Sequence, residues 1–174
     1  MLWKTHFLAG ASAGLLVAGQ HADAKTALVS AGVAGLAALL PDIDSPDSWI
    51  GRAVPVLPRV LKTAVGHRGA LHSLAGMAFV TLLFSLWFRH ENIAYLTLPF
   101  LVGYLSHIGV DALNPPKVPL LWPLGWRFGI GLVNPCGILE RAVVVPGLFL
   151  LFIFLAYQPG KILLASLAKK VVFW

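Results

Sequence analysis

Charged side chains are scarce in this chain. Only 11% of its 174 residues are Asp, Glu, Lys or Arg, whereas 58% are hydrophobic. Soluble domains carry about a quarter charged residues. The shortage excludes a single soluble core with a well-solvated surface, so apolar surface must face lipid. We therefore expect one membrane-embedded domain that spans residues 1–174.

Cysteine is almost absent, and several common signatures are missing. Because Cys136 is alone, an internal disulfide and a cysteine-based zinc site are excluded. The formal net charge of +6 does not indicate nucleic acid, since no module of interleaved aromatic and basic residues is present. Basic residues that flank membrane spans and meet anionic headgroups explain it better. The chain has no nucleophile elbow, phosphate-binding glycine loop or dinucleotide-binding fingerprint.

Long apolar runs are what the sequence has instead. Each run is about long enough to cross a bilayer, although the first two are short. Backbone groups in lipid must be satisfied internally, and no alternating pattern supports a barrel. The sequence predicts an all-α, polytopic transmembrane bundle of about five spans. They lie at approximately residues 5–20, 26–41, 71–88, 93–112 and 142–158.

The segments outside these runs have their own signatures. We expect interfacial helices at residues 49–65 and in the tail from Gly160, and a proline-stiffened loop at headgroup depth over residues 113–140. Small residues in the first two spans predict close helix packing, because they let backbones approach in lipid. These residues are Gly10, Gly14, Gly32 and Gly35.

Alternating crossings place most of the titratable residues on one side of the membrane. An acid at the centre of a membrane helix costs roughly 2.5–3.5 kcal/mol, so such groups need partners, and a metal ion is one. The same side carries eight of the 13 Lys and Arg residues, which favours the cytoplasm. The titratable group comprises His6, Asp42, Asp44, His67, His72, His107, Asp111 and Glu140.

Two of the local patterns offer oxygen and nitrogen ligands. His107 and Asp111 are four residues apart, so they share a helix face and could bind one divalent metal. A hydrogen bond between them in a polar interior patch explains the spacing equally well. Asp42 and Asp44 follow an apolar run and suit hard cations. Taken alone, they are better explained as an Asp-rich turn after a helix.

The other candidates are more ambiguous on their own. His67 and His72 flank a bend at Gly69, and Arg68 between them suits an anionic substrate such as a phosphate. An arginine that follows the positive-inside rule is the alternative. His6 alone is a common interfacial residue. Three interpretations stay open for Glu140: a further metal ligand, a general base, or a negative charge that stabilises the N-terminus of a helix.

The joint pattern is more specific than any of its parts. Several histidine-containing segments and one diacid segment fall on one face, and metal-dependent hydrolases use such ligands with an open position for water. The metal lowers the pKa of that water and so supplies a nucleophile. The proposed ligands are His6, Asp42, Asp44, His67, His72, His107 and Asp111.

The motifs together resemble the YdjM-like family of inner-membrane proteins, which are regarded as metal-dependent hydrolases. One departure is the pair Ala70 and Leu71, where the family commonly has a hydroxyl residue before the second histidine. The spacing is also similar, more loosely, to zinc-dependent phospholipase C. The resemblance implies zinc and a lipid-type phosphoester substrate. It rests on His6, Leu40 to Pro46, Ile50 to Arg52, His67 to Ser73, Gly103 to Asp111, and Leu120 to Pro123.

The sequence therefore predicts an inner-membrane hydrolase. Arg68 would bind the substrate phosphate, and Asp44 or Glu140 would act as the base. Membrane lipids are the expected partners, nucleic acid is not, and a homo-oligomer is left open. The main alternative is a non-catalytic metal-binding membrane protein, such as a regulator, a sensor or a small transporter. A further alternative is a scaffold with a polar interior network.

Overall fold

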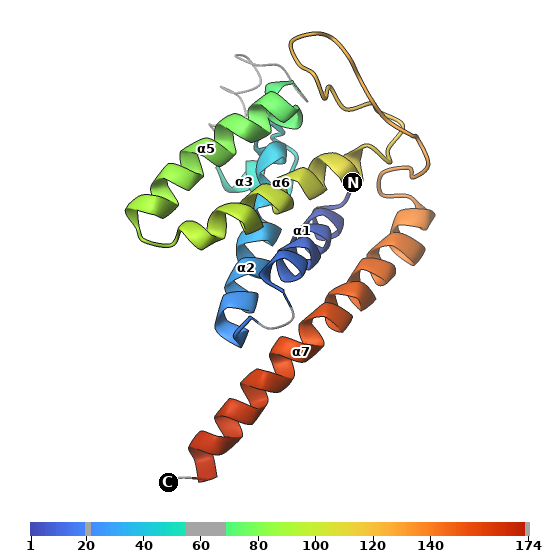
Figure 1. Ribbon diagram of the computed structural model, residues 1–174. Helices are drawn as coiled ribbons and strands as arrows, with labels where there is room; N and C mark the ends of the chain where they lie inside the picture. Colours follow the sequence, from blue (N-terminus) through green and yellow to red (C-terminus); the bar gives the residue numbers. More distant parts are fainter. Residues whose placement is uncertain (20–21, 55–68, 173–174) are drawn as a thin grey trace.

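A computed structural model describes residues 1–19, 22–54 and 69–172, and helices dominate this part of the chain (Figure 1). Over these residues there is no β-strand, and Val118 and Phe128 form an isolated antiparallel bridge. The prediction of an all-α fold is confirmed. The α-helices are α1 (Trp3–Ala18), α2 (Ala24–Ala37), the short α3 (Trp49–Ala53), α5 (Leu74–His90), α6 (Thr97–Asp111) and α7 (Val145–Val172). Shorter helical turns are η1 (Leu40–Asp44), η2 (Ala70–His72), η3 (Ala94–Leu96) and η4 (Glu140–Val144).

Two helical segments of the described chain are long and apolar enough to cross a membrane. They are Ala24–Asp44, with 21 residues, and Glu140–Tyr157, with 18 residues. Helix α5 is apolar but has only 17 residues. Helices α1 and α6 have 16 and 15 residues, and at 1.5 Å per residue they reach only about 23 Å of a hydrocarbon core about 30 Å thick. The five apolar runs are thus five helices, but in the described chain only two of them are long and apolar enough to cross a membrane.

Helix α1 packs against α2, α6 and α7, and glycine allows the closest of these approaches. A Cβ atom at Gly10 would lie 2.5 Å from the carbonyl oxygen of Ala34 in α2, and one at Gly103 of α6 would lie 2.1 Å from that same oxygen. Gly14 and Gly35 are similarly tight, as the sequence predicted. The prediction is wrong for Gly32, where a Cβ atom would have no neighbour within 4 Å.

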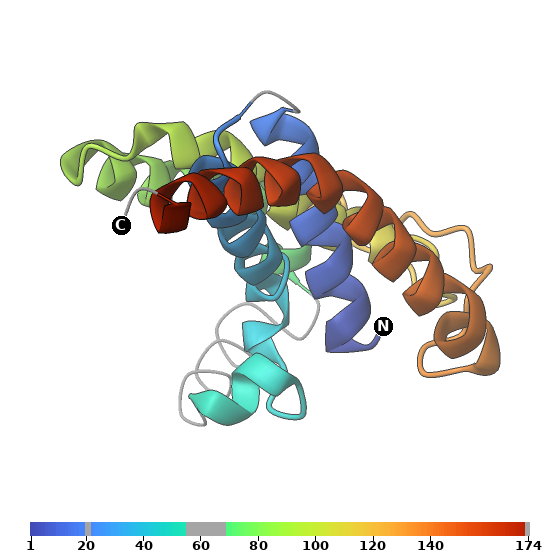
Figure 2. The same cartoon turned by 90° about the horizontal axis from the view of Figure 1, so that it is seen from below.

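The segments outside the long runs differ from expectation in part. Helix α3 occupies the start of the interfacial helix expected at 49–65, and the rest of that segment lies outside the described residues. The tail does not form a separate helix, because α7 continues through Pro159 to Val172. Figure 2 shows α7 crossing α1 and α2, and it contacts both. The expected proline-rich loop connects α6 to η4.

Two apolar clusters hold the helices in place. One centres on α6, where Phe100, Tyr104 and Ile108 pack with Phe88 of α5. The other lies where α1 and α2 meet, around Ala11, Leu15 and Ala27, with residues of α7 against it. Asp23 caps the N-terminus of α2. Its carboxylate accepts hydrogen bonds from the hydroxyl and the amide of Thr26, and these bonds lower the pKa of the Asp23 carboxyl group. The two clusters leave one end of the bundle for polar side chains.

Candidate metal centre

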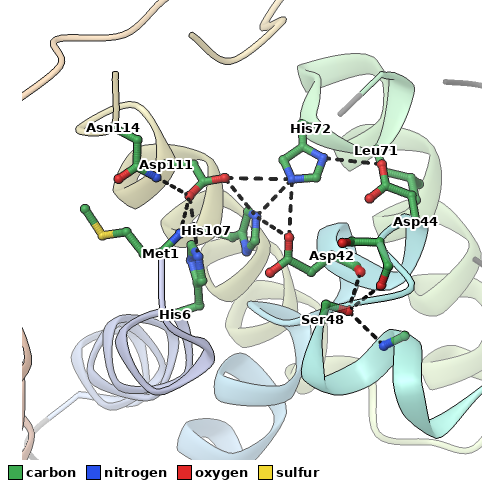
Figure 3. A network of polar contacts seen from close by, with 12 residues as sticks. Met1, His6, Asp42, Asp44, Ser48, Leu71, His72, His107, Asp111 and Asn114 are labelled. Carbon is green, nitrogen blue, oxygen red and sulfur yellow. Dashed lines mark hydrogen bonds and ion pairs between the residues drawn. The ribbon is translucent and has the colours of Figure 1, made fainter. Parts of the chain in front are cut away.

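Four segments bring imidazole and carboxylate groups together at this end of the bundle (Figure 3). The first turns of α1, the η1 turn after α2, the η2 turn before α5 and the last turns of α6 all contribute. Six described side chains form the cluster. Only that of Asp42 is appreciably exposed, at 23%, whereas the other five side chains are exposed by 2% or less. His67 and Arg68, which the sequence also proposed, lie outside the described residues. The six described side chains are His6, Asp42, Asp44, His72, His107 and Asp111.

His107 lies at the centre of the cluster. Its Nδ1 atom lies 2.7 Å from the carbonyl oxygen of Ala38 and donates a hydrogen bond to it. In a neutral imidazole this leaves the lone pair on Nε2. That Nε2 atom lies 3.2 Å from Nε2 of His72 and 3.6 Å from Oδ2 of Asp111. The backbone of α2 therefore orients a ring nitrogen toward two other potential ligands.

Asp111 presents its two oxygens to different partners. Oδ1 accepts a hydrogen bond of 2.8 Å from the amide of Asn114 and lies 3.2 Å from the α-amino group of Met1. Oδ2 lies 3.6 Å from Nε2 of His107 and 3.8 Å from Nε2 of His72. One oxygen is thus held in place by donors, while the other faces the two imidazoles.

His72 lies between two further carboxylates. Its Nε2 atom is 3.7 Å from Oδ1 of Asp42, and its Nδ1 atom is 3.8 Å from Oδ2 of Asp44. The turn that carries both acids is fixed by Ser48, whose hydroxyl donates to the carbonyl oxygen of Asp42 at 2.7 Å. On the other side, the Tyr104 hydroxyl donates to the carbonyl oxygen of Leu71, the residue before His72. Both backbones that carry the ligands are therefore held by hydrogen bonds.

His6 is buried without a hydrogen-bond partner on either ring nitrogen. Its ring stacks on that of His107 with centroids 3.9 Å apart, and its Nε2 atom lies 3.5 Å from Oδ1 of Asp111. An unsatisfied buried polar group costs about 1–3 kcal/mol and is commonly explained by an ion or a water molecule. The nitrogen and oxygen donors of this cluster are those that zinc takes in proteins.

Among the described residues, several sets of three side chains have ligand atoms that lie within 4.8 Å of one another, and His107 belongs to each of them. His107 forms such a set with His72 and Asp111, and it also belongs to two others. One set adds His6 and Asp111, and the other adds Asp42 and His72. The residues present therefore fit a metal ion and could hold one.

Glu140 is buried near this cluster but has different partners. Its carboxylate accepts hydrogen bonds of 2.6 Å from the amide of Leu2, the hydroxyl of Thr5 and the amide of Cys136. All three donors belong to the start of α1 or to the turn before η4. Glu140 thus joins two chain segments next to His6, a role for which the sequence offered only the charge itself.

Sequence reasoning missed several residues that support the cluster. Asn114 follows Asp111 by three residues, and Tyr104 precedes His107 by three. This helical spacing was a signal that could have identified both of them. The sequence could not identify the carbonyl group of Ala38 in this way, because every residue has a backbone acceptor whatever its side chain.

Comparison with known proteins adds a family to this geometry. The family model of the YdjM inner membrane protein matches residues 1–169. The inner membrane proteins YdjM of Escherichia coli (strain K12) and Shigella flexneri are each 39% identical over 105 residues, or 58% of this chain. The chain covers 52% of each of these two proteins.

A third relative is similar over nearly the whole chain. The uncharacterized protein YvsG of Bacillus subtilis (strain 168) is 29% identical over 158 residues, which cover 91% of this chain and 96% of YvsG. No solved structure matches the chain. The described residues contain two candidate membrane spans, and two of these relatives are named inner membrane proteins. By the extent of the family match, the chain belongs to the YdjM family of inner membrane proteins.

Proposed function

We propose that this protein is a membrane-bound, zinc-dependent hydrolase that acts on a phosphoester. The observation that carries the proposal is the spacing of three ligand atoms. Nε2 of His107, Nε2 of His72 and Oδ2 of Asp111 lie 3.2, 3.6 and 3.8 Å apart. In a tetrahedral zinc site, metal–ligand distances of about 2.0–2.2 Å give ligand–ligand distances of about 3.3–3.6 Å. Three protein ligands leave a fourth position, as catalytic zinc sites do.

Asp42 is the proposed general base. Its Oδ1 atom lies 3.7 Å from Nε2 of His72 and 4.0 Å from Nε2 of His107, near enough to act on a water molecule bound between them. Its side chain is also the one with appreciable exposure. A bound zinc ion would supply Lewis acidity toward water and phosphate oxygen. Oδ1 of Asp42 would accept the proton of the attacking water, a step that typically contributes 10²–10⁴-fold.

The remaining side chains would orient these groups. Oδ2 of Asp44 faces Nδ1 of His72, as a carboxylate behind a metal-bound histidine does. Glu140 has three donors of its own, which supports an anchoring role rather than proton transfer. Arg68 remains the proposed phosphate ligand on sequence grounds. The cytoplasmic side also remains a proposal from the distribution of basic residues.

The test is hydrolysis by protein purified in detergent and loaded with zinc. We expect cleavage of the soluble diester bis(4-nitrophenyl) phosphate. Asp42→Asn should lower kcat by at least about 100-fold with zinc content unchanged. Arg68→Ala should raise KM or abolish turnover with zinc retained, and Arg89→Ala, at the far end of α5, is its control. Loss of zinc in Asp42→Asn would make Asp42 a ligand instead of a base.

A non-catalytic metal-binding protein, such as a regulator or a sensor, is the second candidate. The observation in its favour is burial, because five of the six described side chains are exposed by 2% or less. A regulator would bind zinc and would have no need of Arg68. Zinc binding without turnover on any phosphoester, together with an Arg68→Ala variant that behaves like the wild type, would favour this function.

A further inference from the structure

An apolar groove of about 380 Å³ lies between α2 and the α5–α6 hairpin. Its volume falls within the range of about 300–1,000 Å³ that small-molecule sites occupy. Aliphatic side chains of α2 and η1 form one wall, and aromatic side chains of α5 and α6 form the other. The lining includes Val33, Leu36, Leu40, Phe84, Trp87 and Phe100.

The groove borders the η1 turn, which also carries two acids of the candidate metal centre. Leu40, which lines the groove, lies in η1 two residues before Asp42. Asp42 is also the member of the cluster with an exposed side chain. From Leu40 the lining continues back along α2 to Val33, a length of about 10 Å at 1.5 Å per residue.

Helix α3 packs against η1 and carries a basic residue. Helix α3 contributes Ile50 to the lining and has Arg52 exposed two residues later. The start of α3 is held over α1 by stacking of Trp49 on Trp3, with ring centroids 5.5 Å apart. The lining of the groove is therefore apolar, and one of the helices that border it also carries an exposed basic residue.

We propose that this groove holds an acyl chain of a phospholipid whose phosphate lies beside Asp42 and Arg52. The inference rests on the proposed function, because it names the substrate class of the same site. A lining with almost no polar atoms does not suit a sugar or an extended peptide, since their polar groups would lose hydrogen bonds. An amphiphile with an anionic head and an apolar tail matches both features. The helical segment Ala24–Asp44, which forms one wall of the groove, is a candidate membrane span, so a lipid can enter the groove sideways from the bilayer.

Photo-crosslinking tests the occupant without relying on turnover. The probe is a phosphatidic acid with a diazirine near the end of one acyl chain, incorporated into phosphatidylcholine nanodiscs with the protein. We expect label on the segments that contain Val33–Leu40 and Phe84–Phe100. Leu36→Trp, which fills the groove, should reduce that label at least about fivefold.

Leu28→Trp is the matched control. Both leucines are exposed on α2, at 51% for Leu28 and 57% for Leu36, but Leu28 is not part of the groove lining. If Leu36→Trp does not fold, Val33→Phe blocks the same wall one turn away. Label spread equally over the groove and the exposed face of α7, or unchanged in both groove variants, would overturn the inference. So would a dimer interface that contains Leu36, since a second copy would then fill the groove.

Kinetics separate this inference from the proposed function. Leu36→Trp should lower kcat/KM for a long-chain phospholipid about tenfold and leave cleavage of bis(4-nitrophenyl) phosphate unchanged. Equal effects on both substrates would contradict the acyl site while the hydrolase proposal stands. If the zinc-loaded protein cleaves neither substrate, the hydrolase proposal fails, and the crosslinking pattern still decides whether the groove binds an acyl chain.

Discussion

Nδ1 of His107 donates a hydrogen bond of 2.7 Å to the carbonyl oxygen of Ala38, so a residue of α6 is oriented by the end of α2. The two residues are 69 positions apart in the chain. The contact determines which ring nitrogen carries the proton, because the carbonyl oxygen can only accept. Nε2 of His107 is then left for the shared centre of the cluster.

This contact predicts the tautomer of His107. In ¹⁵N-labelled protein, Nδ1 should be protonated and Nε2 should not, both before and after zinc is added. Zinc should shift the Nε2 resonance much more than that of Nδ1. A His107→Gln variant identifies the resonances, and His90, which is 84% exposed on its side chain and lies outside the cluster, serves as a reference that zinc should leave unchanged. Protonation at Nε2 in the metal-free protein would contradict this arrangement.

Asn114 should matter for metal affinity although it is not a proposed ligand. Its amide donates to Oδ1 of Asp111 at 2.8 Å. Removal of such supporting hydrogen bonds typically weakens metal binding 10–100-fold. We expect an effect of about this size for Asn114→Ala in a zinc titration with a competing chelator. Asn134→Ala, at an exposed position, should bind zinc like the wild type, and equal affinities of the two variants would sink the prediction.

The sequence predicted the helices and the composition of the cluster better than it predicted its geometry. Apolar runs identify helices in lipid because the backbone has no other way to satisfy its hydrogen bonds. Because successive spans cross the membrane in opposite directions, the sequence places His6, Asp44, His72 and His107 at the same end of the bundle. The structure brings these four side chains together. Their convergence follows from which end of each helix carries a polar residue, and this can be deduced without distances.

What the sequence could not supply depends on contacts between distant segments. Helix α1 has the length that the run at 5–20 predicted but begins two residues earlier, and α6 is shorter than the run at 93–112 because the separate η3 turn takes up the start of that run. Glu140 was predicted as a ligand or a base on its charge. Its three donors come from Leu2, Thr5 and Cys136. Leu2 and Thr5 lie more than 130 residues away in the chain, so no local sequence pattern could predict these hydrogen bonds. The apolar groove likewise exists only once α2 and α5 are placed.

Glu140 should behave as an anchor. Glu140→Gln keeps the size of the side chain but sets an amide donor against buried donors, and an unsatisfied buried group costs about 1–3 kcal/mol. We expect a lower midpoint of thermal unfolding in detergent, with zinc binding retained at temperatures well below that midpoint. Glu91→Gln, on an exposed turn, should leave the midpoint unchanged. A variant of Glu140 that is as stable as the wild type but has lost turnover would indicate a role in proton transfer instead.

Gly103 should be intolerant of even one methyl group. A Cβ atom there would lie 2.1 Å from the carbonyl oxygen of Ala34, so α6 would have to move away from α2. Overpacking of this kind typically costs about 1–3 kcal/mol. Gly109 lies on the same helix with no atom within 4 Å of a Cβ position, and alanine there should be neutral or stabilising by up to about 1 kcal/mol. Thermal unfolding of Gly103→Ala and Gly109→Ala should therefore differ in direction, and equal midpoints would contradict the close approach of the two helices.

The metal content of the purified protein tests the central claim most directly. Inductively coupled plasma mass spectrometry of detergent-purified protein, after dialysis against zinc and then against metal-free buffer, should give at least one zinc ion per chain. His107→Ala should lose it, because removal of a ligand weakens binding by more than the 10–100-fold that loss of a supporting residue typically causes, while His90→Ala keeps it. A wild-type protein that retains no more divalent metal than folded His107→Ala would contradict the account, because the buried imidazoles and carboxylates would then be a polar network without an ion.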